Sequence, residues 1–428
     1  MNMDIVHEMI DFIDKSPVSF QAVAVMEKKL LSSGYEELHE NEKWDVKANG
    51  EYYVNRNDSA LISFKIPEKF KGFRVMASHS DSPSFRVKED PEIDVEQHYV
   101  KLNVEKYGGM LMAPWFDRPL SVAGRVIVRD KGVNVTGKDG LRSALVDLGC
   151  DAAIIPNLAI HMNSDANNGY KYNAQNDMLP LYGLEGAKGT FMKRIAAAAG
   201  VEEDDILGND LYLYNRMKGI TWGNDGEFVS SPRLDDLECA FCSLKGFLSG
   251  SKKEHIAVNC VFDNEEVGSG TRQGASSTFL KDVLERIENC LGRNREDYII
   301  DLADSFMLSA DNAHAVHPNH VDKSDPVNRP IINGGIVLKN SADQKYCTDG
   351  ISAAMVRSIC GDAGVPVQVF TKRSDMKGGS TLGNLSNIQV PMHTADIGLA
   401  QLAMHSPFET AGSRDPEFLI KLAERFFE

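Results

Sequence analysis

Short apolar runs that alternate with longer, helix-periodic segments constrain the fold of this chain more than any other feature. The strand-length apolar runs are residues 73–78, 256–262, 305–309 and 367–370. The segments with apolar side chains at helical spacing are residues 4–14, 19–33, 276–292 and 348–361. Strands that alternate with helices in this way predict an α/β fold whose sheet is covered on both faces.

The middle of the chain has a different pattern. Residues 125–135 are typical of a β-hairpin, 163–176 of a polar loop, and 192–200 of an Ala-rich helix. A chain of 428 residues has room for two or three domains at roughly 150 residues each. We therefore interpret residues 89–230 as a β-rich domain inserted into an α/β domain that is formed by residues 1–88 and 231–428.

The charge balance and the chain start exclude several classes of protein. The formal net charge of -16 argues against nucleic-acid binding, which needs a basic surface. No run approaches the ~18 consecutive apolar residues of a membrane span, and the first residues lack the basic and apolar regions of a secretory signal. Cys239 and Cys242 form the one CxxC, which we interpret as buried helix cysteines. These features favour a protein of the reducing cytoplasm.

Polar clusters follow three of the apolar strands, where an open α/β sheet places its ligand crevice. His79 and Asp81 follow the first strand, Glu265 and Glu266 the second, and Asp311 the third. An imidazole can bind a metal ion while a carboxylate holds its other ring nitrogen. Of two adjacent glutamates, one can bind metal and the other can act as a general base. Read separately, the His79 motif is a weak signal, and the two glutamates could also lie in a solvated turn.

Five further candidate residues could have a structural role in place of binding a metal ion. Asp235 and Asp236 begin a predicted helix, where N-capping is the favoured role of an aspartate, although a carboxylate there could bridge two metal ions. His314 and His317 fit a solvated loop, and His405, among apolar residues, fits a core position. Taken together, the histidines and carboxylates match the ligand inventory of a two-metal hydrolase.

Seven ordered motifs, spread over nearly the whole chain, resemble those of the aspartyl aminopeptidase family of dinuclear-zinc metallopeptidases. They are SHSDSPSFRVK, PWFDRPLSVAGRV, SPRLDDL, DNEEVGSGTRQGA, SADNAHAVHPN, GGSTLGN and QLAMHSPFE. The resemblance implies a mixed-sheet zinc-peptidase catalytic domain, interrupted by the inserted domain, whose role is dimerisation. It also implies a metalloaminopeptidase that removes N-terminal Asp or Glu from peptides.

The resemblance also implies roles for the metal-site residues. His79, Asp235 and Asp311 would bind one ion, and Asp235, Glu266 and His405 the other, so that Asp235 bridges the two. Glu265 would be the general base, and Asp81 would orient His79. The two divalent ions would be Zn²⁺, with Co²⁺ and Mn²⁺ also suited to these nitrogen and oxygen ligands.

Substrate contacts and assembly follow from the same resemblance. Lys339 would pair with an acidic substrate side chain, Tyr346 would contact the substrate, and His161 would reach the active site of a neighbouring subunit. The family implies a homo-oligomer, a tetrahedral dodecamer built from dimers.

Two departures from the family pattern leave the substrate preference open. Asp236 stands where the family often has Asn, and residues 373–379 differ from those of acidic-specific relatives. A preference for neutral, Leu-like N-terminal residues is therefore an alternative. A non-catalytic assembly or cargo scaffold is another, as is a deacylase or carboxypeptidase on the same metal core.

Overall fold

The computed structural model describes residues 3–129, 140–251, 253–376 and 378–428, and the chain forms two compact units. The first unit consists of Met1–Asp81, Gly219–Met404 and Glu409–Glu428, and the second of Ser82–Lys218 and His405–Phe408. The second unit thus differs in its bounds from the interval 89–230. Strands β11 and β12, which lie between residues 219 and 231, belong to the first unit because they continue into pairing with its strand β20.

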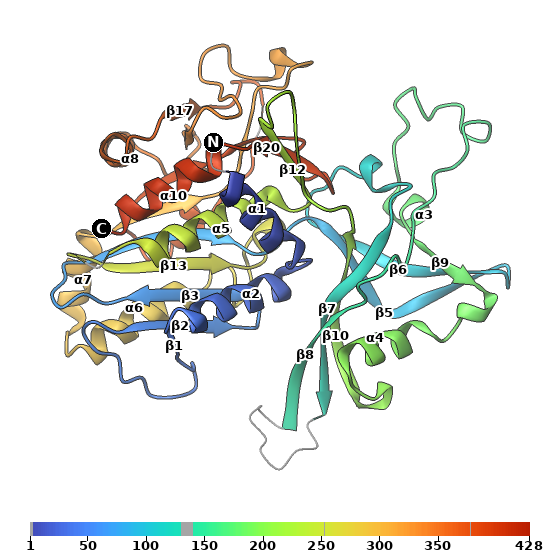
Figure 1. Ribbon diagram of the computed structural model, residues 1–428, viewed down its shortest axis with the longest axis horizontal. Coiled ribbons are helices and arrows are strands. Elements are labelled where there is room, and N and C mark those ends of the chain that lie inside the picture. The colour runs from blue at the N-terminus through green and yellow to red at the C-terminus, as the bar shows by residue number, and fades with distance from the viewer. Residues whose placement is uncertain (1–2, 130–139, 252, 377) are drawn as a thin grey trace. The chain divides into compact units, whose positions relative to one another are not determined.

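A nine-stranded mixed sheet forms the centre of the first unit (Figure 1). Its strands, in spatial order, are β1 (Glu36–Glu37), β2 (Glu51–Arg56), β3 (Ala60–Lys65), β13 (Ile256–Phe262), β4 (Phe73–His79), β14 (Phe306–Ala310), β18 (His393–Gly398), β16 (Ile336–Lys339) and β17 (Val367–Phe370). The four central strands, β13, β4, β14 and β18, are parallel to one another. Strand β3 pairs in antiparallel orientation with β13 on one side, and β16 pairs in the same way with β18 on the other. The carboxyl ends of the central strands therefore share one edge of the sheet.

Two hydrophobic cores lie on opposite faces of this sheet, because successive strand residues point to opposite sides. On β13, Ala257 and Val261 join one core, whereas Val258 and Cys260 join the other. The first core is covered by α1 (Met3–Asp14), α2 (Ser19–Ser32), α5 (Leu234–Ser249), α8 (Gly350–Ala363) and α10 (Asp415–Phe426). The second is covered by α6 (Phe279–Cys290), α7 (Arg295–Ala303) and α9 (Leu382–Ser386). The predicted α/β fold with helices on both faces is confirmed.

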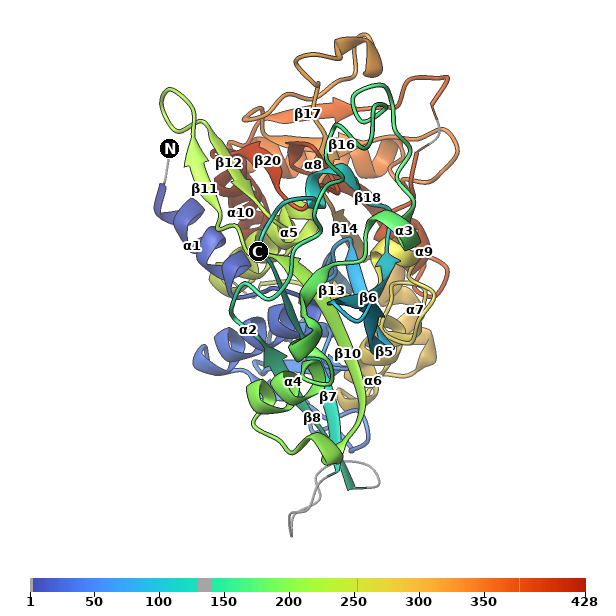
Figure 2. The same ribbon diagram turned by 90° about the vertical axis from the view of Figure 1, so that its right-hand side faces the viewer.

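A smaller five-stranded sheet completes the first unit (Figure 2). Its strands, in order, are β11 (Ile220–Trp222), β12 (Phe228–Ser231), β20 (Glu409–Gly412), β19 (Ala400–Leu402) and β15 (Ala313–His314). This sheet joins segments that are far apart in the sequence, since Ser231 of β12 pairs with Glu409 of β20.

The second unit contains a six-stranded antiparallel sheet. Its strands, in order, are β8 (Leu141–Asp147), β7 (Leu120–Arg129), β10 (Ile206–Asn215), β5 (Ser84–Val95), β6 (Tyr99–Tyr107) and β9 (Leu181–Leu184). Its core includes Phe191 and Ile195 from α4 (Phe191–Ala199), and a short helix, α3 (Ala174–Asp177), begins within the predicted polar loop 163–176. The inserted segment is thus β-rich.

Most elements end within a few residues of their predicted bounds, and capping explains two of the shifts. Helix α8 starts later than predicted because Asp349 and Ser352 form a capping box, and the helix ends at Gly364 in the left-handed conformation. Gly200 ends α4 in the same conformation.

Residues 130–135 of the predicted hairpin lie outside the described residues. Strand β7, which ends at Arg129, pairs with β8, which begins at Leu141. Among the described helices, none is long and apolar enough to cross a lipid bilayer.

Candidate metal centre

The candidate site is built at the shared carboxyl edge of the central strands. Strand β4 ends at His79, directly opposite Phe262, the last residue of β13. The one-turn helix η5 (Glu265–Val267) follows β13, and Asp311 follows β14. The register of these parallel strands brings the three polar clusters to one place, as expected for the ligand crevice of an open α/β sheet.

Asp235 and Asp236 reach the site from the start of α5, where the backbone is not helical. The α5 N-terminus has no side-chain cap, and both aspartates have non-helical backbone angles after Arg233, whose φ is 58°. Asp236 Oδ2 accepts a hydrogen bond from the His79 backbone N–H at 3.0 Å, and the Asp235 N–H donates to Glu409 Oε2 at 3.0 Å. These contacts tie both residues to the strand ends and to β20.

Four buried side chains converge here with the spacing that a metal ion requires. One ligand atom from each of His79, Asp235, Asp236 and Asp311 lies within 4.8 Å of the other three. A second such group joins His79 to Glu265 and Glu266. The His79 Nε2 atom is 3.5 Å from Asp235 Oδ1, so the imidazole faces the carboxylates. One imidazole nitrogen and several carboxylate oxygens form a donor set that fits Zn²⁺ and similar divalent ions.

Asp81 connects the histidine to the glutamates. The Nδ1 atom of His79 lies 3.0 Å from the backbone oxygen of Asp81 and 3.3 Å from its Oδ1 atom. The same carboxylate accepts the backbone N–H groups of Glu265, at 3.1 Å, and Glu266, at 3.2 Å. Asp81 thus fixes the ring orientation that leaves Nε2 toward the cluster, which is what a metal-binding histidine needs.

The carboxyl groups of the cluster need a nearby positive charge to stay ionised. Burial raises the pKa of Asp236, Glu266 and Asp311, and it raises the pKa of Glu265 to about 8. Burial alone would lower the pKa of His79, but Asp236 and the other carboxylates outweigh it and raise that pKa. Asp236 Oδ1 has no hydrogen-bond partner among the described residues. A divalent ion supplies the positive charge that would keep these carboxylates ionised.

Lys339, at the end of β16, lies on the Asp311 side of the cluster. Its ammonium is 3.5 Å from Asp311 Oδ1, and only 3% of its side chain is exposed. Burial lowers the pKa of Lys339, but Asp311 more than offsets this, so the pKa is raised and the ammonium stays charged. The Tyr346 ring is 5.5 Å from that ammonium. Lys339 therefore already compensates part of the charge on Asp311.

Sequence analysis missed Lys372, a second lysine beside Tyr346. Its ammonium is 5.3 Å from the centre of the Tyr346 ring and 3.8 Å from Asp343. Lys372 follows β17, so the rule that selects polar residues after strands would have found it.

His161 and His405 belong to the second unit. His161 is exposed in a turn, and His405 is part of the segment His405–Phe408. The roles given to these two residues stay predictions. His314 and His317 are exposed. Cys239 and Cys242 are buried in α5, in agreement with their interpretation as core cysteines.

The contacts of Asp81 lead to a prediction for its replacement. Asp81→Asn should weaken the affinity for Co²⁺ or Zn²⁺ roughly 10–100-fold. The substitution replaces one of the two acceptor oxygens with an NH₂ donor, which would then face a backbone N–H or His79. Isothermal titration of the chelated and dialysed protein measures this, and Asp45→Asn, which removes an exposed carboxylate, is the control. Unchanged affinity in Asp81→Asn would contradict the orienting role.

Comparison with known proteins gives a consistent family assignment. Residues 12–427 match the family model described as aminopeptidase I zinc metalloprotease (M18). A probable M18 family aminopeptidase 2 of Clostridium acetobutylicum is 44% identical over 434 aligned positions, which cover 99% of each chain. Its counterpart in Pseudomonas aeruginosa strain UCBPP-PA14 is 40% identical and covers 100% of this chain and 99% of its own.

Solved structures show the same fold. The cryo-EM structure of a complex of Ape4 and Nbr1 contains a chain that superposes with a TM-score of 0.94 and 34% identity, over 99% of this chain and 85% of that one. The S. cerevisiae mApe1 dodecamer gives a TM-score of 0.86 and 28% identity, over 99% of this chain and 96% of that one.

Proposed function

The chain belongs to the M18 family of zinc aminopeptidases, and we propose that it removes N-terminal Asp or Glu residues from peptides. The observation that carries the proposal is the buried group of His79, Asp235, Asp236 and Asp311, with Glu265 and Glu266 beside it. A site of this composition suits hydrolysis by a metal-activated water.

Two divalent ions would be held at this site. His79, Asp235 and Asp311 would bind one ion, and Asp235, Glu266 and His405 the other. When bound, two such ions lower the pKa of a water molecule and polarise a scissile carbonyl. The family description names zinc, and Co²⁺ and Mn²⁺ suit the same ligands.

Glu265 would act as the general base. It would take a proton from the attacking water and deliver it to the departing amine. Its backbone N–H is fixed by Asp81, which also holds His79, so the base and one metal ligand share a common support. All proposed ligands and the base are present in the chain, which favours an enzyme over a non-catalytic scaffold.

The acidic preference would come from Lys339, with Tyr346 as a further substrate contact. Support comes from the ammonium of Lys339, which is buried, charged and adjacent to the proposed ligand Asp311. A substrate carboxylate would share this ammonium with Asp311. The neutral, Leu-like preference remains the second candidate, because Lys339 already has a partner.

Turnover of Asp-, Glu- and Leu-p-nitroanilide separates the two preferences. We expect Asp and Glu to be cleaved faster than Leu, and Lys339→Met to lower the Asp-to-Leu ratio of kcat/KM by about 10–100-fold, the effect of one charged hydrogen bond. Lys345→Met, which removes an exposed lysine from the same segment, is the matched control. A ratio that favours Leu in the unchanged protein would overturn the acidic preference. An N-acetylated substrate should not be cleaved; its cleavage would favour a deacylase.

Activity would require assembly into a homo-oligomer, a dodecamer built from dimers through the inserted β-rich segment. His161 would complete a neighbouring active site. Exposed apolar side chains flank this histidine, at Leu158, Ile160 and Met162, and such clusters mark interaction surfaces. The dodecamer of S. cerevisiae mApe1 supports this state by analogy. Native mass spectrometry tests it, and an active monomer would contradict it.

The cytoplasm would be the compartment. All seven cysteines are free, including the buried Cys239, Cys242 and Cys260. Free thiols are typical of reducing compartments.

A further inference from the structure

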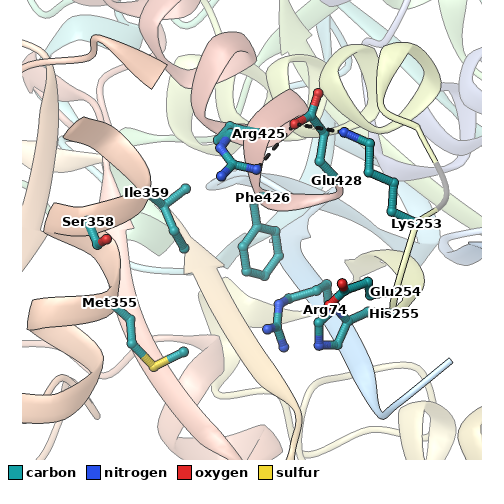
Figure 3. A pocket seen from close by; sticks show the side chains of 10 residues that line it. All are labelled: Arg74, Lys253, Glu254, His255, Met355, Ser358, Ile359, Arg425, Phe426 and Glu428. Carbon is teal, nitrogen blue, oxygen red and sulfur yellow. Dashed lines mark hydrogen bonds and ion pairs between the residues drawn. The ribbon is translucent and has the colours of Figure 1, made fainter. Parts of the chain in front are cut away.

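A cavity of about 460 Å³ lies in the first unit, at the end of β4 opposite to His79 (Figure 3). Arg74, the second residue of β4, and His255, which directly precedes β13, form its polar side. Met355 and Ile359 from α8 and Phe426 from α10 form its apolar side. The other lining residues are polar or charged: Lys253, Glu254, Ser358, Arg425 and Glu428. A cavity of this size that combines polar groups with an apolar part can hold a small molecule.

Arg74 is a partly buried cation without an ion pair among the described residues. Its Nη1 atom donates to the backbone oxygen of Asp304 at 3.2 Å, which leaves Nη2 and Nε without a protein acceptor in the described part of the chain. In Figure 3 the guanidinium extends toward the space bordered by Phe426 and Met355. Burial lowers the pKa of Arg74, although the nearby carboxylates of Asp304 and Glu254 act in the opposite direction.

The other charges around the cavity are already paired. Arg425 binds Asp362 at 3.0 Å and Glu428 at 3.2 Å, and Lys253 lies 3.5 Å from the same glutamate. Glu254, the acidic residue next to His255, is engaged by Lys71 outside the cavity at 2.9 Å. Arg74 is therefore the cation on this lining that is left to bind an external anion.

His255 can add a hydrogen bond but no charge. Burial, together with Arg74 and Lys71, lowers its pKa to about 4, so the imidazole is neutral at physiological pH. A neutral ring beside a guanidinium offers one N–H donor next to the fork of Arg74. Two such donors suit the two oxygens of a carboxylate, which guanidinium groups bind in a bidentate manner.

We infer that this cavity is a second ligand site, which binds a small carboxylate with a short apolar body. The carboxylate lies against Arg74 and His255, and the apolar body packs on Met355, Ile359 and Phe426. The cavity volume is near the lower end of the range for small-molecule sites, which limits the body to one aromatic ring or a short alkyl chain.

Three probes test the inference on the full metal-loaded chain by isothermal titration. 4-Phenylbutyrate carries both features, 4-phenylbutanol lacks the charge, and acetate lacks the apolar body. We expect 4-phenylbutyrate to bind at least tenfold more tightly than either of the others. Arg74→Met should weaken its binding at least tenfold, whereas Lys69→Met, which removes an exposed charge outside the lining, should change it less than twofold.

Further variants keep the test decisive. Ile359→Ser should weaken 4-phenylbutyrate binding through the apolar side even if Arg74→Met folds poorly, which near-ultraviolet circular dichroism would reveal. Equal affinity for the alcohol and the carboxylate overturns the inference, as does unchanged binding in Arg74→Met. Binding that survives in Arg74→Met but is lost in Asp235→Asn would assign the ligand to the metal cluster and would also overturn it.

Discussion

Glu265→Gln should abolish nearly all peptidase activity while the protein keeps its metal. The substitution preserves the shape of the side chain and the backbone N–H that donates to Asp81. It removes the proposed general base, and general-base catalysis contributes about 100–10,000-fold. We therefore expect kcat for an aminoacyl-p-nitroanilide to fall by about 1,000-fold or more, with KM little changed.

The control for this experiment is Glu266→Gln. Glu266 is adjacent in sequence and is also held by Asp81, but its proposed role is to bind metal. Its replacement should lower the metal content, measured by inductively coupled plasma mass spectrometry, as well as activity. A Glu265→Gln protein with full metal content and full turnover would remove Glu265 as the base.

Removal of metal should eliminate activity and destabilise the fold. Asp236, Glu266 and Asp311 are buried carboxyls whose pKa burial raises, so without a cation they must either bind protons or remain charged at a cost in free energy. An ion that binds only the folded state stabilises it by about 4 kcal/mol at 1,000 times its Kd. We expect chelation to lower the melting temperature and to abolish turnover, and Zn²⁺, Co²⁺ or Mn²⁺ to restore both.

The pH dependence gives this prediction a second readout. A carboxyl whose pKa is raised in the folded state stabilises the fold below its ordinary pKa, and this contribution is lost as the pH rises through the folded value. For Glu265 that window runs from 4.5 to about 8. The melting temperature of the metal-free protein should therefore decrease from pH 5 to pH 8, and less so with metal bound.

Asp235→Asn is the matched variant for chelation. It removes the proposed bridging ligand and should make the melting temperature nearly insensitive to chelator. An unchanged protein whose melting temperature and turnover both resist prolonged chelation would contradict a metal-dependent site.

Much of this site could be predicted because strand ends are visible in the sequence. His79, Glu265, Glu266 and Asp311 each follow an apolar run, and parallel pairing brings those ends together. The start of α5 was harder to interpret. Aspartates at a helix start usually cap it, and only the non-helical backbone after Arg233 shows that these carboxylates turn into the cluster.

Long-range contacts set the limit of sequence reasoning. The contact between Lys339 and Asp311 depends on β16 lying beside β18, an antiparallel neighbour that no local pattern specifies. The assignment of residues 219–231 to the first unit likewise depends on β20, which is far away in the sequence. Arg74 carries no signal in the sequence, since its lack of an ion pair emerges only from packing.

The place of β18 in the large sheet sets the order in which a growing chain can fold. This strand lies between β14 and β16, yet all other strands of the sheet are synthesised before it. Glu409, which accepts the hydrogen bond from the Asp235 N–H, is synthesised later still. The segment 82–218 emerges earlier and contains its own sheet. Translation therefore supplies the candidate ligands His79, Asp235, Glu266 and Asp311 before the strand that closes the sheet, and His405 after it, so a nascent chain that ends before β18 cannot yet be a working peptidase.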